Sequence, residues 1–170
     1  GTTFVIRVPF KIDMNADKRE KQKDVSEKSI KGLHILLAED NELNMEIAEF
    51  MLQNEGAEVT KAWNGQEAVE LFRKSKPGEF DVILMDIMMP VMNGYEATKK
   101  IRSLDREDAK MIPIIAMTAN AFTEDRLRAK EAGMDEHIAK PVDGKLLINI
   151  IYKLMKHSFR GSHNEKEKTE

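Results

Sequence analysis

The chain of 170 residues has no cysteine, which excludes disulfides, thiol nucleophiles and zinc sites built on cysteine. No stretch reaches the roughly 18 consecutive apolar residues that span a bilayer, and the first residues lack the basic start and apolar core of a signal peptide. The formal net charge is −3, and no block of Lys and Arg stands free of acids. We therefore expect a cytoplasmic fragment that contacts neither nucleic acid nor membrane, whether or not its parent protein is anchored in one.

Changes in composition along the chain predict four segments. Residues 1–12 alternate like a lone strand whose sheet lies outside this sequence. Residues 13–31 are almost all charged or polar, which is typical of a linker. With 41% hydrophobic residues the chain can build one core, which we place in residues 32–157. We expect residues 158–170 to form a disordered tail, and the missing initiator methionine indicates a piece of a larger protein.

Within residues 32–157, short apolar runs alternate with helical patterns. Continuous apolar runs are typical of central parallel strands that are covered on both faces, and inward stripes at three-to-four spacing are typical of the helices between them. We predict strands over 33–38, 57–62, 81–85, 111–117 and 137–139, each followed by a helix, the last over 143–156. Five such units predict a doubly wound α/β fold with one parallel sheet and right-handed crossovers.

Acidic residues stand where two of these strands end. HILLAED closes on Glu39 and Asp40, and DVILMD closes on Asp86. Because the carboxyl ends of parallel strands share one edge of a sheet, we expect the three acids to meet there. Hard dications prefer oxygen ligands and bind through one or two carboxylates plus phosphate. We therefore predict a Mg²⁺ or Mn²⁺ site with Asp40 and Asp86 as direct ligands, Glu39 acting through water, and the backbone carbonyl of Met88 as a further ligand.

A hydroxyl and an ammonium follow two other strands. PIIAMT ends at Thr118, and HIAKP places Lys140 before a proline. A carboxylate that attacks phosphorus forms an acyl phosphate, while a metal and an ammonium neutralise the phosphoryl oxygens. Each residue alone has an ordinary structural explanation, but together they predict phosphorylation of Asp86, with Lys140 and Thr118 binding the phosphoryl group.

Four strings make this segment resemble the receiver domain of response regulators. They are the Glu39-Asp40 pair, MDIMMPVMNGYEA around Asp86, MTANA around Thr118, and HIAKPV around Lys140. The resemblance implies a flavodoxin-like fold with strand order 2-1-3-4-5. It also implies a Mg²⁺-dependent phosphorylation site at Asp86, with Thr118 and Lys140 as sensors of the phosphoryl group.

The resemblance makes further statements about single residues. It implies a cis Lys140–Pro141 bond, and a loop that modulates access to the phosphoryl group at Met88, Ala119 and Asn120. The chain departs from the family by having Glu39 where aspartate is common. It also has His137 where a rotating Tyr or Phe switch is frequent, and the small polar ring predicts weak coupling to Thr118.

The first ten residues, GTTFVIRVPF, resemble the closing strand of the ATP-binding domain of sensor histidine kinases. The parent is then a hybrid histidine kinase, whereas this fragment lacks kinase motifs and catalyses only its own phosphorylation and dephosphorylation. The implied donor is a phosphohistidine domain in the same parent chain or its dimer mate, and the implied acceptor is a histidine phosphotransfer protein.

Two other functions are compatible with parts of this pattern. In the first, the domain docks on its kinase as an autoinhibitory module, and phosphorylation is secondary. In the second, the chain is a phosphatase of the haloacid dehalogenase type, which also uses an Asp nucleophile and Mg²⁺. That class needs a second Asp two residues after the nucleophile, and Met88 stands at that position.

Overall fold

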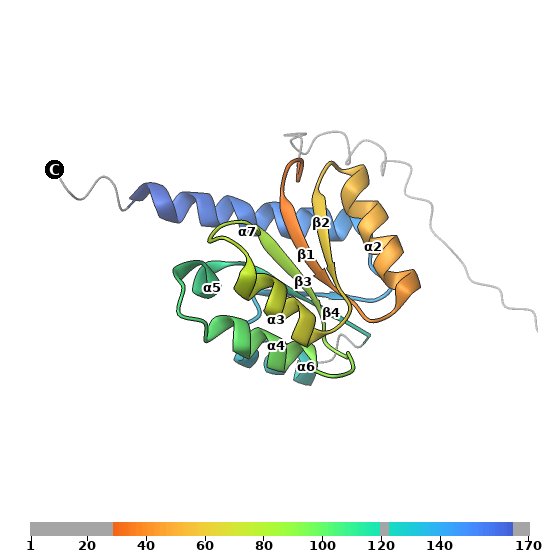
Figure 1. The fold of residues 1–170 in the computed structure, drawn as a ribbon. Coiled ribbons are helices and arrows are strands. Elements are labelled where there is room, and N and C mark those ends of the chain that lie inside the picture. The colour runs from red at the N-terminus through yellow and green to blue at the C-terminus, as the bar shows by residue number, and fades with distance from the viewer. Residues whose placement is uncertain (1–28, 120–122, 165–170) are drawn as a thin grey trace, which may run out of the picture.

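A single parallel sheet organises the computed structural model, which describes residues 29–119 and 123–164 (Figure 1). Its strands are β1 (His34–Ala38), β2 (Glu58–Ala62), β3 (Val82–Asp86), β4 (Ile114–Thr118) and β5 (Glu136–Ala139). They lie in the order β2-β1-β3-β4-β5, and every adjacent pair is parallel. The predicted fold and strand order are therefore confirmed. The expected strand over 1–12, nearly all of the expected linker and Asn120 lie outside the described residues.

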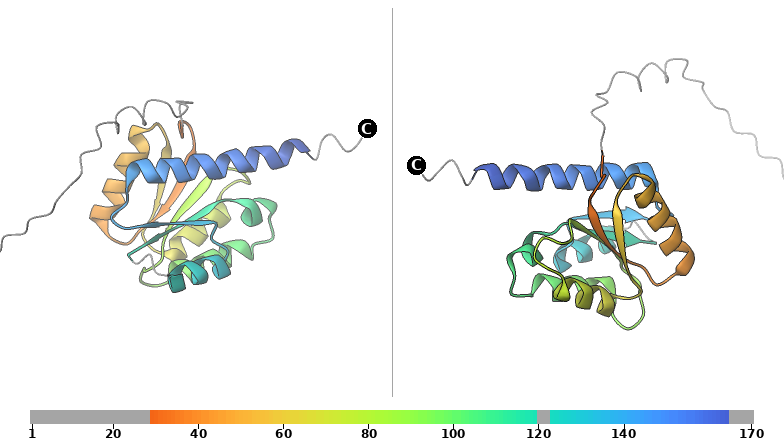
Figure 2. Two further views of the ribbon diagram at one scale, coloured as in Figure 1. Left: turned by 180° about the vertical axis from the view of Figure 1, so that it is seen from behind. Right: turned by 45° about the horizontal axis from the view of Figure 1, so that its top comes forward.

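Helices cover both faces of the sheet (Figure 2). On one face lie α2 (Glu42–Asn54) and α7 (Gly144–Asn164), and on the other lie α3 (Gly65–Lys74), α4 (Gly94–Arg102), the short α5 (Glu107–Met111) and α6 (Thr123–Ala132). Each face has its own apolar core cluster. Strands β3 and β4 are buried throughout because they lie inside the sheet, whereas the edge strands β2 and β5 are partly exposed.

Helices α2, α3 and α4 each begin with an asparagine N-cap. The side chains of Asn41, Asn64 and Asn93 accept hydrogen bonds from backbone N–H groups three residues later, at 3.0, 2.9 and 2.9 Å. An asparagine cap satisfies a helix donor that would otherwise lack an intrahelical partner. These caps fix where the three helices begin: α2 and α3 start close to the ends of β1 and β2, and α4 starts after the loop that follows β3.

The structure differs from the predicted elements in two places. Met111 lies in α5 and is 76% exposed, and β4 begins only at Ile114, after Pro113. The last helix continues to Asn164, so the expected tail is helical from 158 to 164. No proline interrupts this stretch, and Gly161 alone costs a helix only about 1 kcal/mol. None of the helices in the described part of the chain is long and apolar enough to cross a membrane.

Ile30 belongs to the domain core, although its polar neighbours in the sequence predict that it lies in the linker. Its side chain is fully buried in the core cluster beneath α2 and α7. Ile30→Ala is therefore expected to lower the free energy of unfolding by about 2–4 kcal/mol, as for other buried isoleucines. Chemical denaturation would measure this loss, and Leu43→Ala, which truncates a side chain that is 63% exposed, is the matched control. Equal stability of the two variants would contradict the expectation.

Candidate functional site

Three carboxylates meet at the carboxyl edge of the sheet. Glu39 and Asp40 follow β1, and Asp86 is the last residue of the neighbouring β3. One oxygen from each residue can be chosen so that all three lie within 4.8 Å of one another. Glu39 is 2% and Asp86 4% exposed, whereas Asp40 is open to solvent. The predicted convergence of the three acids is therefore confirmed.

Lys140 joins this cluster from the end of β5. Its Nζ lies 2.8 Å from Asp86 Oδ2 and 2.5 Å from Glu39 Oε2. Its backbone N–H donates a 2.7 Å hydrogen bond to the carbonyl of Thr118, which holds the end of β5 beside that of β4. The Lys140–Pro141 bond is cis, as the resemblance implied. One ammonium is thus shared between two buried carboxylates.

The charges of this cluster act on one another. Burial raises the pKa of the Asp86 carboxyl above its usual value, although the hydrogen bond from Lys140 and its charge act in the opposite direction. For Lys140, burial alone would lower the pKa, but the hydrogen bonds and charges of Asp86 and Glu39 outweigh it and raise the pKa. Lys140 therefore remains an ammonium at neutral pH, while ionised Asp86 carries a cost of burial that a further cation would offset.

The remaining predicted residues surround the acids. Thr118 ends β4 and is 6% exposed, and Ala119 after it is open to solvent. In the loop after β3, the Met88 side chain is 74% exposed and its N–H donates to Asp86 Oδ1 at 3.2 Å. The predicted roles of Thr118, Ala119 and the Met88 carbonyl stay predictions.

Donors from the start of α2 surround Glu39. Its Oε1 accepts hydrogen bonds from the backbone N–H of Asn41 at 3.3 Å and from Nδ2 of Asn44 at 3.1 Å. Both Glu39 oxygens are therefore engaged, one by α2 and one by Lys140. No sequence pattern points to Asn44, because a helical asparagine five residues after an acid carries no recognised signal.

The loop from β3 to α4 passes very close to the acceptor. A Cβ built on Gly94 would lie 2.2 Å from the backbone oxygen of Asp86, so no side chain fits without displacing the strand end. Val91 in the same loop has a φ of 68° and is 83% exposed, a rare conformation for a β-branched residue.

We expect Gly94→Ala to cost about 2–3 kcal/mol of unfolding free energy, because the added methyl group overpacks a rigid strand end. Denaturant unfolding would measure this cost. Gly78→Ala is the comparison for a glycine with open space around it, although its positive φ makes that change mildly unfavourable as well. If Gly94→Ala lowered the unfolding free energy no more than Gly78→Ala does, the close contact between Gly94 and Asp86 would be contradicted.

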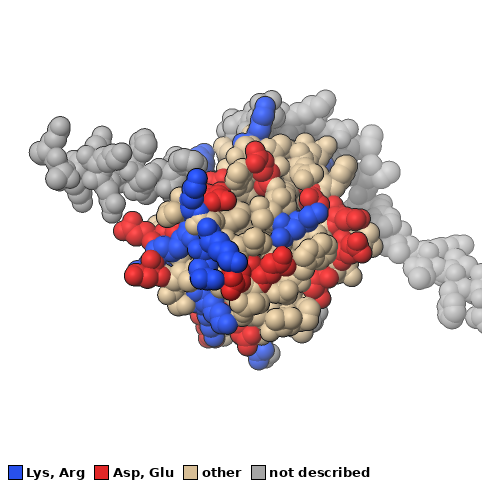
Figure 3. Space-filling view, in the orientation of Figure 1, with Lys and Arg blue, Asp and Glu red and all other residues tan. Residues whose placement is uncertain are grey.

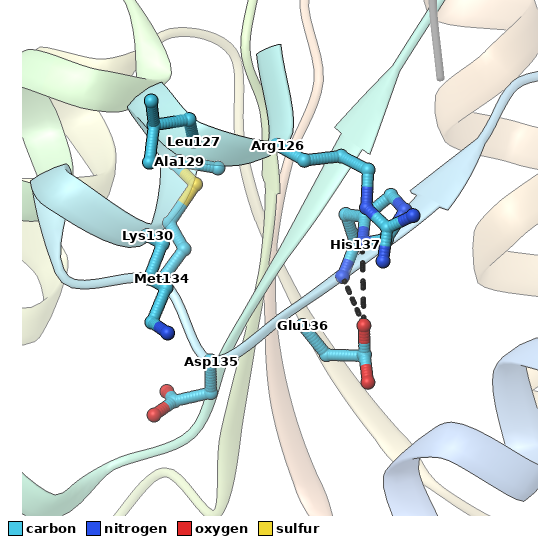
Figure 4. A pocket seen from close by; sticks show the side chains of 8 residues that line it. All are labelled: Arg126, Leu127, Ala129, Lys130, Met134, Asp135, Glu136 and His137. Atoms are coloured by element: carbon cyan, nitrogen blue, oxygen red, sulfur yellow. Dashed lines mark hydrogen bonds and ion pairs between the residues drawn. The ribbon is translucent and has the colours of Figure 1, made fainter. Parts of the chain in front are cut away.

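His137 is not part of the cluster of Glu39, Asp40 and Asp86, and it lines a cavity of about 550 Å³ between α6 and β5. Its Nδ1 is 3.2 Å from Glu136 Oε1, and Figure 4 shows Arg126 next to the ring. The ring is about one-fifth exposed. The three acids of the cluster come from the ends of β1 and β3 and not from β5. The predicted weak switch role of His137 remains a prediction.

The acidic cluster fits a small hard dication. Opposite ligands of octahedral Mg²⁺ are about 4.2 Å apart, so carboxylates already within 4.8 Å need only small rotations to share one ion. All the donors are oxygens, and Asp40 is open to solvent, so a bound ion can keep water ligands. The donor set and its spacing therefore suit Mg²⁺ or Mn²⁺.

Comparisons with known proteins agree on one family. The model of the response regulator receiver domain matches residues 35–152. Histidine kinase 1 of Arabidopsis thaliana is 37% identical over 165 residues, with 78% of this chain and 14% of that protein covered. Hybrid signal transduction histidine kinase I of Dictyostelium discoideum is 39% identical over 119 residues, with 69% and 7% covered. The chain therefore spans only a small part of these relatives.

Solved receiver domains share the fold, and two of them are informative here. The receiver domain of sensor histidine kinase PA1611 from Pseudomonas aeruginosa, with magnesium in its active-site cleft, is 39% identical with a TM-score of 0.67, covering 74% of this chain and 98% of that one. The second is the receiver domain of Ssk1 from Saccharomyces cerevisiae, solved in complex with the histidine phosphotransfer protein Ypd1. That match is 27% identical with a TM-score of 0.66, covering 75% and 92% of the two chains.

Proposed function

The chain belongs to the response regulator receiver family, and on that premise we propose that it accepts a phosphoryl group on Asp86 in a Mg²⁺-dependent reaction of a phosphorelay. One observation carries the proposal: a single lysine ammonium bridges two almost fully buried carboxylates at the edge where the strands end. Such a cluster is costly as a purely structural device, because buried ion pairs rarely outweigh their desolvation. Ionisable groups whose pKa values are shifted in this way cluster at functional sites.

The side chains suggest how the reaction proceeds. One carboxylate oxygen of Asp86 attacks phosphorus, the new O–P bond forms as the N–P bond of a phosphohistidine breaks, and the leaving imidazole takes up a proton. Lys140, already at 2.8 Å from Asp86, moves onto a phosphoryl oxygen as negative charge arrives. Thr118 donates its hydroxyl to another phosphoryl oxygen. Asp40 and Asp86 would hold a dication directly, with the Met88 carbonyl as a further ligand and Glu39 acting through water, and such an ion would neutralise further negative charge on the phosphoryl group.

The direct test is phosphorylation by a small donor. Incubation with phosphoramidate and Mg²⁺, followed by intact-mass measurement and peptide mapping, is expected to show one phosphoryl group on Asp86. Chelation of the metal should abolish the uptake, and Mn²⁺ should replace Mg²⁺ at least partly. Uptake that persists in the chelator, or that maps to a serine or threonine, would refute the assignment.

An apolar stripe on α2 suggests where a protein partner docks. Leu43, Ile47 and Phe50 recur every three to four residues along the helix, and they are 63%, 43% and 72% exposed. The same helix carries three acids, Glu42, Glu46 and Glu49, and it has no Lys or Arg. Figure 3 shows acidic side chains on the side of the molecule where α2 lies. We assign this surface to a phosphohistidine protein that presents an apolar helix face bordered by Lys or Arg.

A comparison of two phosphoryl donors, one a protein and one a small molecule, distinguishes partner docking from the phosphorylation step. Phe50→Ala is expected to slow transfer from a phosphorylated histidine phosphotransfer protein about tenfold more than it slows uptake from phosphoramidate, because interface truncations act on partner binding. Equal slowing with both donors would place the docking surface elsewhere.

The proposal extends to the parent protein. The parent is a hybrid histidine kinase, with residues 1–12 closing its ATP-binding domain, residues 13–29 as linker, and a phosphohistidine domain in the same chain or its dimer mate as donor. The complete acidic site favours this over a domain that only docks and inhibits. An Asp86→Asn fragment that still regulated the kinase fully would support the docking alternative.

A further inference from the structure

We propose that Asn44 is a positioning residue for the phosphorylation site: it holds the Glu39 carboxylate so that Glu39 in turn holds Lys140 beside Asp86. This inference rests on the proposed function, because it names a residue that prepares the same site. The observation behind it is an unbroken chain of contacts, Asn44 Nδ2 to Glu39 Oε1 at 3.1 Å, Glu39 Oε2 to Lys140 Nζ at 2.5 Å, and Lys140 Nζ to Asp86 Oδ2 at 2.8 Å.

Glu39 needs such a holder because of its length and burial. A glutamate has one more rotatable bond than an aspartate, and side-chain freedom must be removed before a long carboxylate can hold a fixed position. The residue is 2% exposed, so its oxygens depend on protein donors. Among the described residues its Oε1 has two of them: the Asn41 backbone N–H at 3.3 Å and, closer, the side chain of Asn44 at 3.1 Å.

The helix itself does not require the Asn44 side chain. The cap of α2 is completed by the backbone N–H of Asn44, which donates to Asn41 Oδ1 at 3.0 Å whatever side chain stands there. Asparagine is also a poorer helix former than leucine. Its amide therefore serves Glu39 at a small cost to the helix, which favours a role in the site over a role in folding.

The contact decides where Lys140 lies before phosphate arrives. With Glu39 oriented by Asn44, the ammonium is drawn to a point between two carboxylates instead of collapsing onto Asp86 alone. Lys140 thereby contacts Asp86 through Oδ2 while also being held by Glu39, and it needs only a short movement to reach a phosphoryl oxygen. Loss of Asn44 lets Glu39 rotate and leaves Lys140 paired with Asp86, which must then be separated before reaction.

The test compares variants by the rate of Asp86 phosphorylation from phosphoramidate at saturating Mg²⁺. Asn44→Leu keeps a similar size and removes the donor, and we expect it to slow phosphorylation about tenfold, the usual effect of removing a residue that orients a ligand. Asn44→Gln, which retains an amide, is expected to recover most of the rate. Asn54→Leu, the same change about 15 Å further along the helix, is the control.

A double-mutant cycle separates positioning from a general structural effect. In the Glu39→Gln background, Asn44→Leu is expected to slow the reaction little further, because its effect passes through the Glu39 carboxylate. In metal-free wild type the ammonium signal of Lys140 should be resolved by NMR, and its chemical shift should change in Asn44→Leu, because the lysine then pairs with Asp86 without the fixed contact to Glu39. Multiplicative rate losses, or an unchanged Lys140 signal, would overturn the inference.

Different results would refute the positioning role of Asn44 and the proposed phosphorylation of Asp86. Wild type that is phosphorylated at the same rate as Asn44→Leu would remove the role of Asn44 and leave the proposed function intact. Wild type that takes up no phosphoryl group would refute the proposed function, and the Lys140 signal would then decide the Asn44 contact by itself.

Discussion

Replacing Asp86 with asparagine is expected to abolish phosphorylation and, in the absence of a divalent cation, to raise the thermal midpoint at neutral pH. The side chain is 4% exposed, and burial raises the pKa of its carboxyl, so ionised Asp86 destabilises the folded protein. Asparagine keeps the shape and removes that charge, while Lys140 keeps its contact with Glu39. We expect a rise of about 2–5 °C, the size that roughly 1 kcal/mol gives in a domain of this length.

The pH dependence follows from the direction of the shift. A carboxyl whose folded pKa lies above its unfolded value of about 3.9 favours the folded state when protonated, and that advantage is lost as pH rises through the folded pKa. The gain of Asp86→Asn over wild type should therefore vanish at strongly acid pH and grow toward neutrality. Calorimetric scans over this range measure it, and Asp105→Asn, which changes an exposed acid, is the control. A lower midpoint for Asp86→Asn at neutral pH would contradict the account.

Removing the charge of Lys140 should have the opposite effect on stability. Lys140→Met leaves the Glu39 and Asp86 carboxylates buried without their ammonium, and breaking a fully buried pair costs 3–5 kcal/mol. Because the lysine is about one-fifth exposed and the acids can take up protons instead, we expect a smaller loss of roughly 2–3 kcal/mol at neutral pH. The loss should shrink as pH falls, since protonated acids no longer need the cation.

Mg²⁺ binding offers a second measure of the same variant. The uncompensated acids are expected to bind the dication several times more tightly in Lys140→Met, whereas phosphorylation slows because a phosphoryl oxygen loses its ammonium. Calorimetric titration and the phosphoramidate assay measure the two effects, with Lys145→Met, an exposed lysine of α7, as control. Weaker Mg²⁺ binding in Lys140→Met would mean that the lysine helps to shape the metal site.

Several contacts that stabilise the domain had no counterpart in the sequence. The guanidinium of Arg106 donates to the carbonyls of Phe72, Ser75 and Lys76 and stacks 4.5 Å above the Phe72 ring. Arg102 donates to the carbonyls of Gly133, Ala109 and Ile112. Residues this far apart in sequence meet only when the helices pack, so local periodicity could not indicate them.

The sequence by itself determined the fold class and the chemical content of the site. Buried strands need continuous apolar runs, and the strands of a parallel sheet all end at one edge, so the residues that end HILLAED, DVILMD, PIIAMT and HIAK had to meet there. The tertiary structure decided how these groups hold one another: that Lys140 is shared between Glu39 and Asp86, that Asn44 orients Glu39, and that Ile30 belongs to the core. Side-chain pairing depends on distances of a few tenths of an ångström between separate elements, and these are set by packing, which no local pattern encodes.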